Sequence, residues 1–290
     1  MKFISTSEGK KAILVFLFLF FTVMVVKAAV ITSVATGFWN SSSTWDCNCV
    51  PGNGTDVVIA TGTTVTLNGI STLYRTKALI IEANATFSNG FNNIIKVKGD
   101  YILNGTHSGT GVIELEGMFA LVDGTGVITN PTDILINRNV TIPASANITK
   151  TTGSIIINGN KIITNYGVVT ISTGSLEGTS TGSSWINDVG STLNVAQNIL
   201  SMGILTADAV GNTVHYTGTA NQNITLPQTS YYDLLISGSG TKFQPANLIV
   251  TNSLTLAGGV FSLNTFDLNI AGNWINTGGT HDATNGTVFF

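Results

Sequence analysis

The residues with the clearest catalytic potential are two carboxylates, Glu114 and Glu116. They lie two positions apart, so on a strand both side chains point to the same side, opposite Ile113 and Leu115. Enzymes that cleave polysaccharides use such a pair of carboxylates as acid and base or nucleophile. The same spacing also suits ion pairs with lysines on a neighbouring strand, which contribute about 0.2–1 kcal/mol each.

Lysines in the required phase are present. Lys96 and Lys98 occupy the outward phase of the preceding sequence unit, and Glu82 has a matching position one unit earlier. Stacking of these units would align Glu82, Lys98 and Glu116 in one row. It would also place Lys96 beside Glu114. We therefore interpret these five charges as a structural ladder, and we assign no catalytic residue.

The three histidines are isolated from one another and from cysteine in the sequence, so zinc-ligand spacing is absent. No calcium loop, phosphate-binding loop or dinucleotide motif occurs either. We expect no metal and no cofactor. His107 and His281 occupy equivalent Gly-Thr-His positions of an internal repeat. This recurrence predicts a role at a turn or corner.

Cys47 and Cys49 are the only cysteines. Export from the cytoplasm favours oxidation. A Cys-x-Cys bridge, however, closes a very tight ring, which disulfide geometry tolerates poorly. A local disulfide, two free thiols and a bond to another chain all stay open.

Trp39 and Trp45 flank a serine-rich stretch. We interpret them as a cover for the open end of the first coil, since an uncapped strand edge invites aggregation. The alternative is that the two rings bind sugars by stacking.

Beyond residue 30 no segment shows the apolar period of a helix. Short runs rich in Val, Ile and Thr recur instead, separated by turns rich in Gly and Asn. The unit is a strand, a polar turn and a second strand, and it returns commonly after about 20 residues. Such a period predicts a parallel β-helix, in which each coil completes its core by stacking on the next. An antiparallel β-sandwich or barrel array is the alternative.

The repetition is visible directly. Residues 95–107 (IKVKGDYILNGTH) align with residues 268–281 (LNIAGNWINTGGTH) with one inserted residue. Residues 212–216 match residues 286–290, which start 74 positions later. We therefore expect a longer super-repeat of several coils, and a chain that is truncated as a new one opens.

The first residues predict export. Three lysines precede an apolar run from Ala12 to Val26, and Val26 and Ala28 supply the small residues of a cleavage site. This is the pattern of a secretory signal peptide, assigned to residues 1–28. A membrane-spanning helix needs about 20 apolar residues, so we expect no membrane span after cleavage. Residues 30–68 then form an N-terminal cap and first coil, and residues 69–290 form the β-helix repeats.

Composition narrows the partners. Removal of residues 1–28 leaves 8 basic and 14 acidic residues of the 12 and 15 in the whole chain, a net charge near −6. So few cations cannot form the basic face that phosphate neutralisation requires, so we expect no nucleic acid partner.

The start of the expected mature chain resembles large secreted repeat proteins of gliding-type Gram-negative bacteria, which are adhesin-like and often end in a type IX secretion sorting domain. The resemblance is carried by residues 37–40 (GFWN), 43–45 (STW), 47–52 (CNCVPG), 56–59 (DVVI) and 62–67 (GTTVTL). It implies a right-handed parallel β-helix on a secreted or outer-surface protein.

The function expected from these observations is that of a non-enzymatic structural or adhesin-like cell-surface protein, with surface polysaccharide or other cell-surface components as partners. One alternative is a carbohydrate-active β-helix enzyme, a lyase or glycosidase. The other is a carbohydrate-binding module that uses Trp39 and Trp45.

Overall fold

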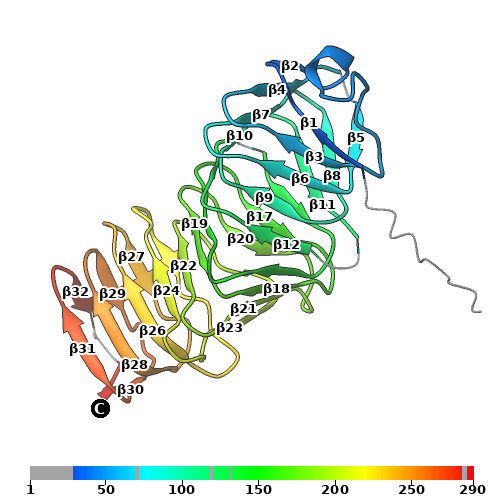
Figure 1. Ribbon diagram of the computed structural model, residues 1–290. Helices are drawn as coiled ribbons and strands as arrows, with labels where there is room; N and C mark the ends of the chain where they lie inside the picture. Colours follow the sequence, from blue (N-terminus) through cyan, green and yellow to red (C-terminus); the bar gives the residue numbers. More distant parts are fainter. Residues whose placement is uncertain (1–28, 70–71, 118–119, 131, 283–285) are drawn as a thin grey trace, which may run out of the picture.

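The protein is an elongated stack of parallel strands (Figure 1). The computed structural model describes residues 29–69, 72–117, 120–130, 132–282 and 286–290, so the expected signal peptide lies outside the described residues. The described strands form about 11 coils, and every ladder between them is parallel. The predicted parallel β-helix is therefore confirmed, and the antiparallel alternative is wrong.

The strands belong to four sheets that run along the rod. The first contains β1 (Val30–Thr32), β3 (Asp56–Ile59), β6 (Ala78–Ile81), β9 (Tyr101–Leu103), β12 (Ala120–Asp123), β15 (Val140–Ile142), β18 (Ile162–Asn165), β21 (Ser184–Asn187) and β23 (Ile204–Thr206). The second contains β2 (Gly37–Phe38), β4 (Thr64–Leu67), β7 (Thr86–Asn89), β10 (Thr106–Gly109), β13 (Val127–Ile128), β16 (Asn147–Lys150), β19 (Val168–Ile171), β22 (Thr192–Val195), β24 (Thr213–Tyr216), β26 (Tyr231–Ile236), β28 (Leu248–Leu256), β30 (Leu268–Ile270), β31 (Asn273–Asn276) and β33 (Val288–Phe289).

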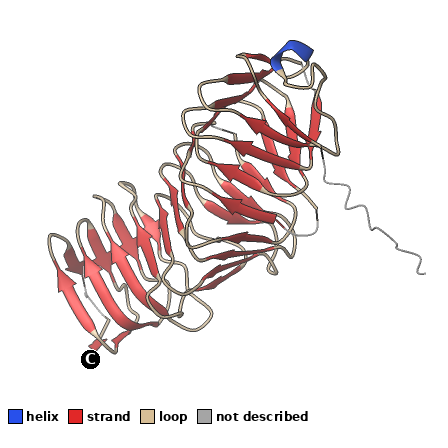
Figure 2. Cartoon of the chain, viewed as in Figure 1, coloured by secondary structure: helices blue, strands red, loops and turns tan. Residues whose placement is uncertain are grey.

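Two shorter sheets complete the coils. The third sheet contains β5 (Leu73–Thr76), β8 (Ile94–Val97), β11 (Val112–Leu115), β14 (Ile134–Ile136), β17 (Ile155–Ile157) and β20 (Leu176–Gly178). The fourth contains β25 (Gln222–Asn223), β27 (Thr241–Phe243), β29 (Val260–Ser262) and β32 (Thr280–Asp282). The short 3-10 helix η1 (Ser42–Thr44) lies at the N-terminal end of the rod (Figure 2).

Strands form because apolar residues alternate with polar ones over short runs. In β4, Val65 and Leu67 are buried, whereas the two threonines between and before them face outward. Parallel stacking then aligns the inward side chains in rows, such as Val65, Phe87 and His107. Each row forms a continuous strip of core, because every coil buries its apolar side chains against the coils above and below.

One coil of the N-terminal half takes one strand from each of the first three sheets, as β6, β7 and β8 do. Stacked positions are separated by 18 residues at the shortest, from Ile94 to Val112, and by 24 at the longest, from Val168 to Thr192. The expected period of about 20 residues agrees with this range.

The expected super-repeat is wrong. Thr213 stacks with Asp233, which stacks with Ser253, whereas Val288 stacks with Leu268 and Leu248 in a different column. The two segments thus occupy different positions around the coil. The first repeat match is also shifted by one face, since it starts in the third sheet at β8 but at β30 in the second. The strand–turn–strand pattern recurs because any face of the coil can use it.

The cross-section of the rod changes in the C-terminal half. There β28 extends over nine residues, and its first part pairs with β30 while its last part pairs with β31. The corner that separates the first and second sheets elsewhere is thereby replaced by one long strand. On the third face, a single bridge between Leu176 and Ile199 follows β20, and the fourth sheet then takes over.

Candidate functional site

The carboxylate pair lies on the outer side of the third sheet, where one lysine neutralises it. Lys96 Nζ is 2.6 Å from Glu114 Oε2 and 3.3 Å from Glu116 Oε2. The β8–β11 register places Lys96 directly beside Glu114, as the sequence predicted. The hydrogen bond to Glu114 is the main cause of a raised Lys96 pKa, against the opposing effect of burial. Both carboxylates are therefore held as anions by one cation, which is a structural arrangement.

The predicted row of Glu82, Lys98 and Glu116 is wrong. Glu82 follows β6 in the first sheet, on another face of the rod, where its carboxylate accepts hydrogen bonds from the backbone N–H and hydroxyl of Thr61 at 2.9 and 3.1 Å. The physical reason is that a coil holds three strands, so the preceding strand in the sequence is not the one stacked below. In the third sheet the residue beside Lys96 on β5 is Arg75.

Trp39 and Trp45 pack against each other at the N-terminal end of the core. Their ring centroids are 5.2 Å apart in an edge-to-face arrangement, and the Trp45 indole N–H donates to the Trp39 carbonyl at 2.7 Å. Both side chains are buried, at 1% and 2% exposure. Phe87 continues the aromatic packing into the next coil, 5.8 Å from Trp39. The rings thus cover the core end and offer no free face for stacking on a sugar.

Cys47 and Cys49 are joined by a disulfide in the exposed loop after η1, with their Cα atoms 5.1 Å apart. Of the three alternatives that the sequence left open, the structure contains the local bridge. The bridge lies just after Trp45, so it stabilises the loop that holds the aromatic cover in place.

Three cations are buried in the rod, although the sequence suggested that its basic residues are scattered on the surface. Arg138, Lys150 and Lys242 are each no more than 1% exposed. They donate to backbone carbonyls of the turns: Arg138 to three carbonyls at 2.6 Å, Lys150 to those of Asn130 and Thr132 at 2.8 and 3.0 Å. Burial lowers the pKa of Lys150 to about 8 and that of Arg138 to about 10. These cations tie the turns of successive coils together.

His107 is fully buried on β10, not at a turn or corner as the sequence indicated. Its Nδ1 is 2.8 Å from the Tyr101 hydroxyl, and its ring packs edge-to-face on Phe87 at 4.8 Å. Burial, with a smaller contribution from the charge of Lys150, lowers the pKa of His107 to about 3. His281 likewise contacts an aromatic ring from its own coil, that of Trp274, at 4.7 Å. The repeated Gly-Thr-His sequence therefore encodes an aromatic contact within a coil.

Buried amides form a second set of polar contacts between coils. Asn165 donates to the side-chain oxygen of Asn187 at 3.0 Å, and Asn187 donates to the backbone carbonyl of Thr213 at 3.0 Å. All three residues belong to successive coils. Such ladders satisfy polar groups that would otherwise be costly to bury, and they fix the register of stacking.

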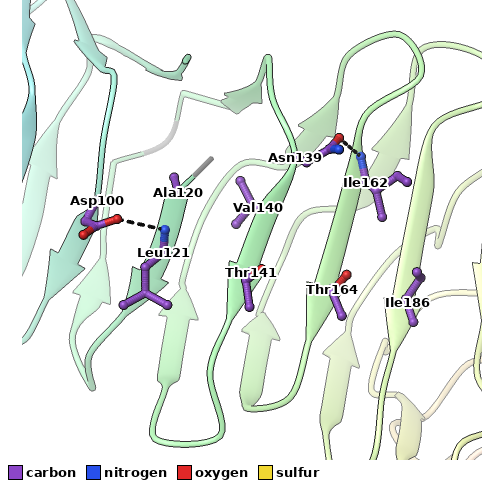
Figure 3. Close-up of a pocket in the computed structure, with 9 residues that line it drawn as sticks. All are labelled: Asp100, Ala120, Leu121, Asn139, Val140, Thr141, Ile162, Thr164 and Ile186. Atoms are coloured by element: carbon purple, nitrogen blue, oxygen red, sulfur yellow. Dashed lines mark hydrogen bonds between the residues drawn. The ribbon is translucent and has the colours of Figure 1, made fainter. Parts of the chain in front are cut away.

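An open depression of about 480 Å³ lies on the outer side of the first sheet (Figure 3). Asp100 is its one ionisable lining residue, and its carboxylate accepts the backbone N–H of Leu121 at 3.1 Å. Asn139, at its rim, accepts the backbone N–H of Ile162 at 3.0 Å. The remaining lining is Ala120, Leu121, Val140, Thr141, Ile162, Thr164 and Ile186. A single carboxylate that is already hydrogen-bonded does not form an acid–base pair.

Within the described residues, no group of three or more His, Cys, Asp and Glu side chains is placed to hold a metal ion. The described part of the chain also holds no helix that is long and apolar enough to cross a membrane.

The fold and these sites define a β-solenoid whose ionisable groups mainly connect its coils. The chain matches no family model, no curated protein and no solved structure. The resemblance to secreted repeat proteins therefore stays a prediction.

Proposed function

We propose that the chain is an exported, non-enzymatic, adhesin-like scaffold of the cell surface. The observation that supports this proposal best is the use of its charged groups. Glu114 and Glu116, the only carboxylates two positions apart in the sequence, share Lys96 as a partner. Lys150 and Lys242 are held by backbone carbonyls inside the rod. The groups that catalysis would require are thus engaged in contacts between coils.

The shape of the molecule supports the same role. Parallel coils present their outward side chains in columns, so that one type of contact can recur along the rod. A surface built in this way suits many weak contacts to an extended partner such as a surface polysaccharide, because their combined effect exceeds that of each contact alone. The Cys47–Cys49 disulfide supports an oxidising, extracytoplasmic location.

Surface display and attachment test the proposal together. The full chain is produced in a Gram-negative host, and its exposure is measured by protease treatment of intact cells and by attachment of the cells to polysaccharide-coated surfaces. We expect exposure and increased attachment. The control lacks residues 1–28 and should stay inside the cell.

Two results would contradict the proposal. One is a full chain that is not exported. The other is release of sugar products from polysaccharide by the purified protein. If such an activity is lost in Glu114→Gln and Glu116→Gln variants but kept in Glu82→Gln, the carboxylate pair is catalytic and the enzyme alternative replaces the scaffold.

A further inference from the structure

The outer side of the second sheet carries a regular array of hydroxyl groups. Six successive strands, β4, β7, β10, β13, β16 and β19, each contribute two outward positions in this region. Eleven of the twelve positions are Thr or Ser, and Val127 is the exception. We call this set the hydroxyl array: Thr64 and Thr66, Thr86 and Ser88, Thr106 and Ser108, Val127 and Thr129, Thr149 and Thr151, Thr170 and Ser172.

The array forms two straight columns because the strands are in register. In the first column, Thr64 pairs with Thr86, and Thr86 pairs with Thr106. The column continues through Val127 to Thr149 and then to Thr170. In the second column, backbone hydrogen bonds of 2.9–3.0 Å from the N–H groups of Thr129, Thr151 and Ser172 to the preceding coil maintain the same register.

The spacing of the array follows from sheet geometry. Neighbouring strands are about 4.8 Å apart, and alternate residues of one strand are about 6.6 Å apart. The hydroxyl array is therefore a two-dimensional lattice with two nearly perpendicular repeats. Most of its members are threonines, whose branched side chains have restricted rotamers. The methyl and hydroxyl groups are thus held in nearly fixed positions.

Charge separates this face from the others. None of the twelve positions of the hydroxyl array is charged or aromatic, and Lys150, on β16, points inward. The third sheet, by contrast, carries Arg75, Lys96 and Glu114 in one outward row. In the second sheet the first outward ionisable residue after the array is His215, on β24.

Several hydroxyls of the array have no intramolecular partner. Among the described residues, the side chains of Thr86, Ser88, Thr106 and Ser108 make no hydrogen bond, although they are only partly exposed. They therefore face water. One hydrogen bond contributes about 1 kcal/mol net, so useful affinity requires many of these hydroxyls to bind at once. A ligand that meets this condition must itself be a lattice.

We propose that the hydroxyl array binds ice. The prism faces of hexagonal ice present water oxygens at repeats close to those of the array along both axes. The hydroxyls supply donors and acceptors that continue the ice lattice, and the threonine methyl groups order the water between them. Crystalline polysaccharide is the competing lattice, but its sugar rings are bound mainly by aromatic side chains, which the array lacks.

This inference rests on the proposed adhesive role and deepens it, because it names what one face adheres to. The test measures the adsorption of purified, fluorescently labelled protein to a slowly growing ice crystal, together with thermal hysteresis. The disrupted variant carries Thr106→Lys and Thr149→Lys, in the middle of the first column. The control carries Thr141→Lys and Thr164→Lys, which are outward neighbours on the first sheet. Circular dichroism and thermal unfolding verify that each variant is folded.

We expect the wild-type protein and the control to be incorporated into ice and to shape its growth. The disrupted variant should fall to the level of a protein that does not bind ice. Absence of adsorption by the wild type, or equal adsorption by the disrupted variant, would overturn the proposal. So would binding to crystalline cellulose or chitin, but not ice, that the same two substitutions abolish. A chain that is displayed and adhesive on cells but does not adsorb to ice would refute this inference alone.

Discussion

Lys150 illustrates what a buried cation does in this rod. Its ammonium group is enclosed with backbone carbonyls, and burial lowers its pKa to about 8, below the value near 10.4 of an exposed lysine. Between these two values the unfolded chain holds more protons than the folded one. Stability contributed by this site therefore increases as pH rises from about 8 to about 10.

The corresponding experiment compares wild-type protein with Lys150→Met by urea unfolding at pH 7.5, 8.5 and 9.5. We expect the wild type to gain stability relative to the variant across this series. A constant difference between the two proteins would show that the lysine does not titrate in this range. Lys161→Met serves as the control, because Lys161 lies on the partly exposed surface of the same region.

His107 gives the opposite end of the pH scale. Burial lowers its pKa to about 3 in the folded protein, whereas a free histidine titrates near 6.5. Since only the unfolded chain takes up a proton between these values, stability should be complete above pH 6.5 and should fall as pH decreases toward 3. His107→Phe should reduce this slope when melting temperature is measured from pH 7 to pH 4. An unchanged slope would assign the acid sensitivity to other groups, of which His215, with its pKa lowered by burial to about 4, is the first candidate.

At the scale of single elements, the ion pairs between β8 and β11 can be tested for their contribution. Lys96→Met leaves Glu114 and Glu116 as neighbouring anions without a cation, so we expect a loss of about 1 kcal/mol in the free energy of unfolding. A second substitution, Glu114→Gln, should restore part of this loss. Lys98→Met is the control with little expected effect. Equal losses for both lysines would contradict the assignment.

The turns between strands have a requirement of their own. Gly109 has φ +96°, and a Cβ atom there would lie 2.0 Å from the Asn89 carbonyl oxygen of the preceding coil. Gly190 also has a positive φ, +69°, but no atom within 4 Å of such a Cβ. Gly190→Ala should therefore cost about 1 kcal/mol. Gly109→Ala should cost several times more, because the backbone of two coils would have to separate. Equal melting temperatures for the two variants would contradict close coil contact at Gly109.

Much of this element-level detail follows from alternation along each strand. The rule predicted Lys96 beside Glu114, and it also indicates an inward Lys150, which shares the phase of Ile148. Alternation does not reveal how many strands make one coil. Glu82 was placed in the wrong row for that reason, since its strand precedes β8 in the sequence but lies on another face.

At the scale of the whole molecule, the sequence predicted parallel stacking and a period of about 20 residues, because its Gly and Asn turns do not occupy two-residue hairpin positions. It did not predict the change in cross-section. Thr251, Asn252 and Ser253 look like a polar turn, yet they lie within the continuous strand β28. They can do so because each stacks on a strand of the next coil, a contact that no local pattern reports.

Parallel stacking also has a mechanical consequence. Each inner strand is hydrogen-bonded only to the coil before it and the coil after it, so a force applied along the rod loads one interface at a time. Such a stack should unravel from its ends as a series of small events. Each event would release one coil of about 20 residues, or roughly 70 Å of extended chain. Single-molecule stretching should record this as a regular staircase, and one large rupture would show that the coils fail together. A cell held by this protein would therefore have a tether that lengthens gradually under load before it breaks.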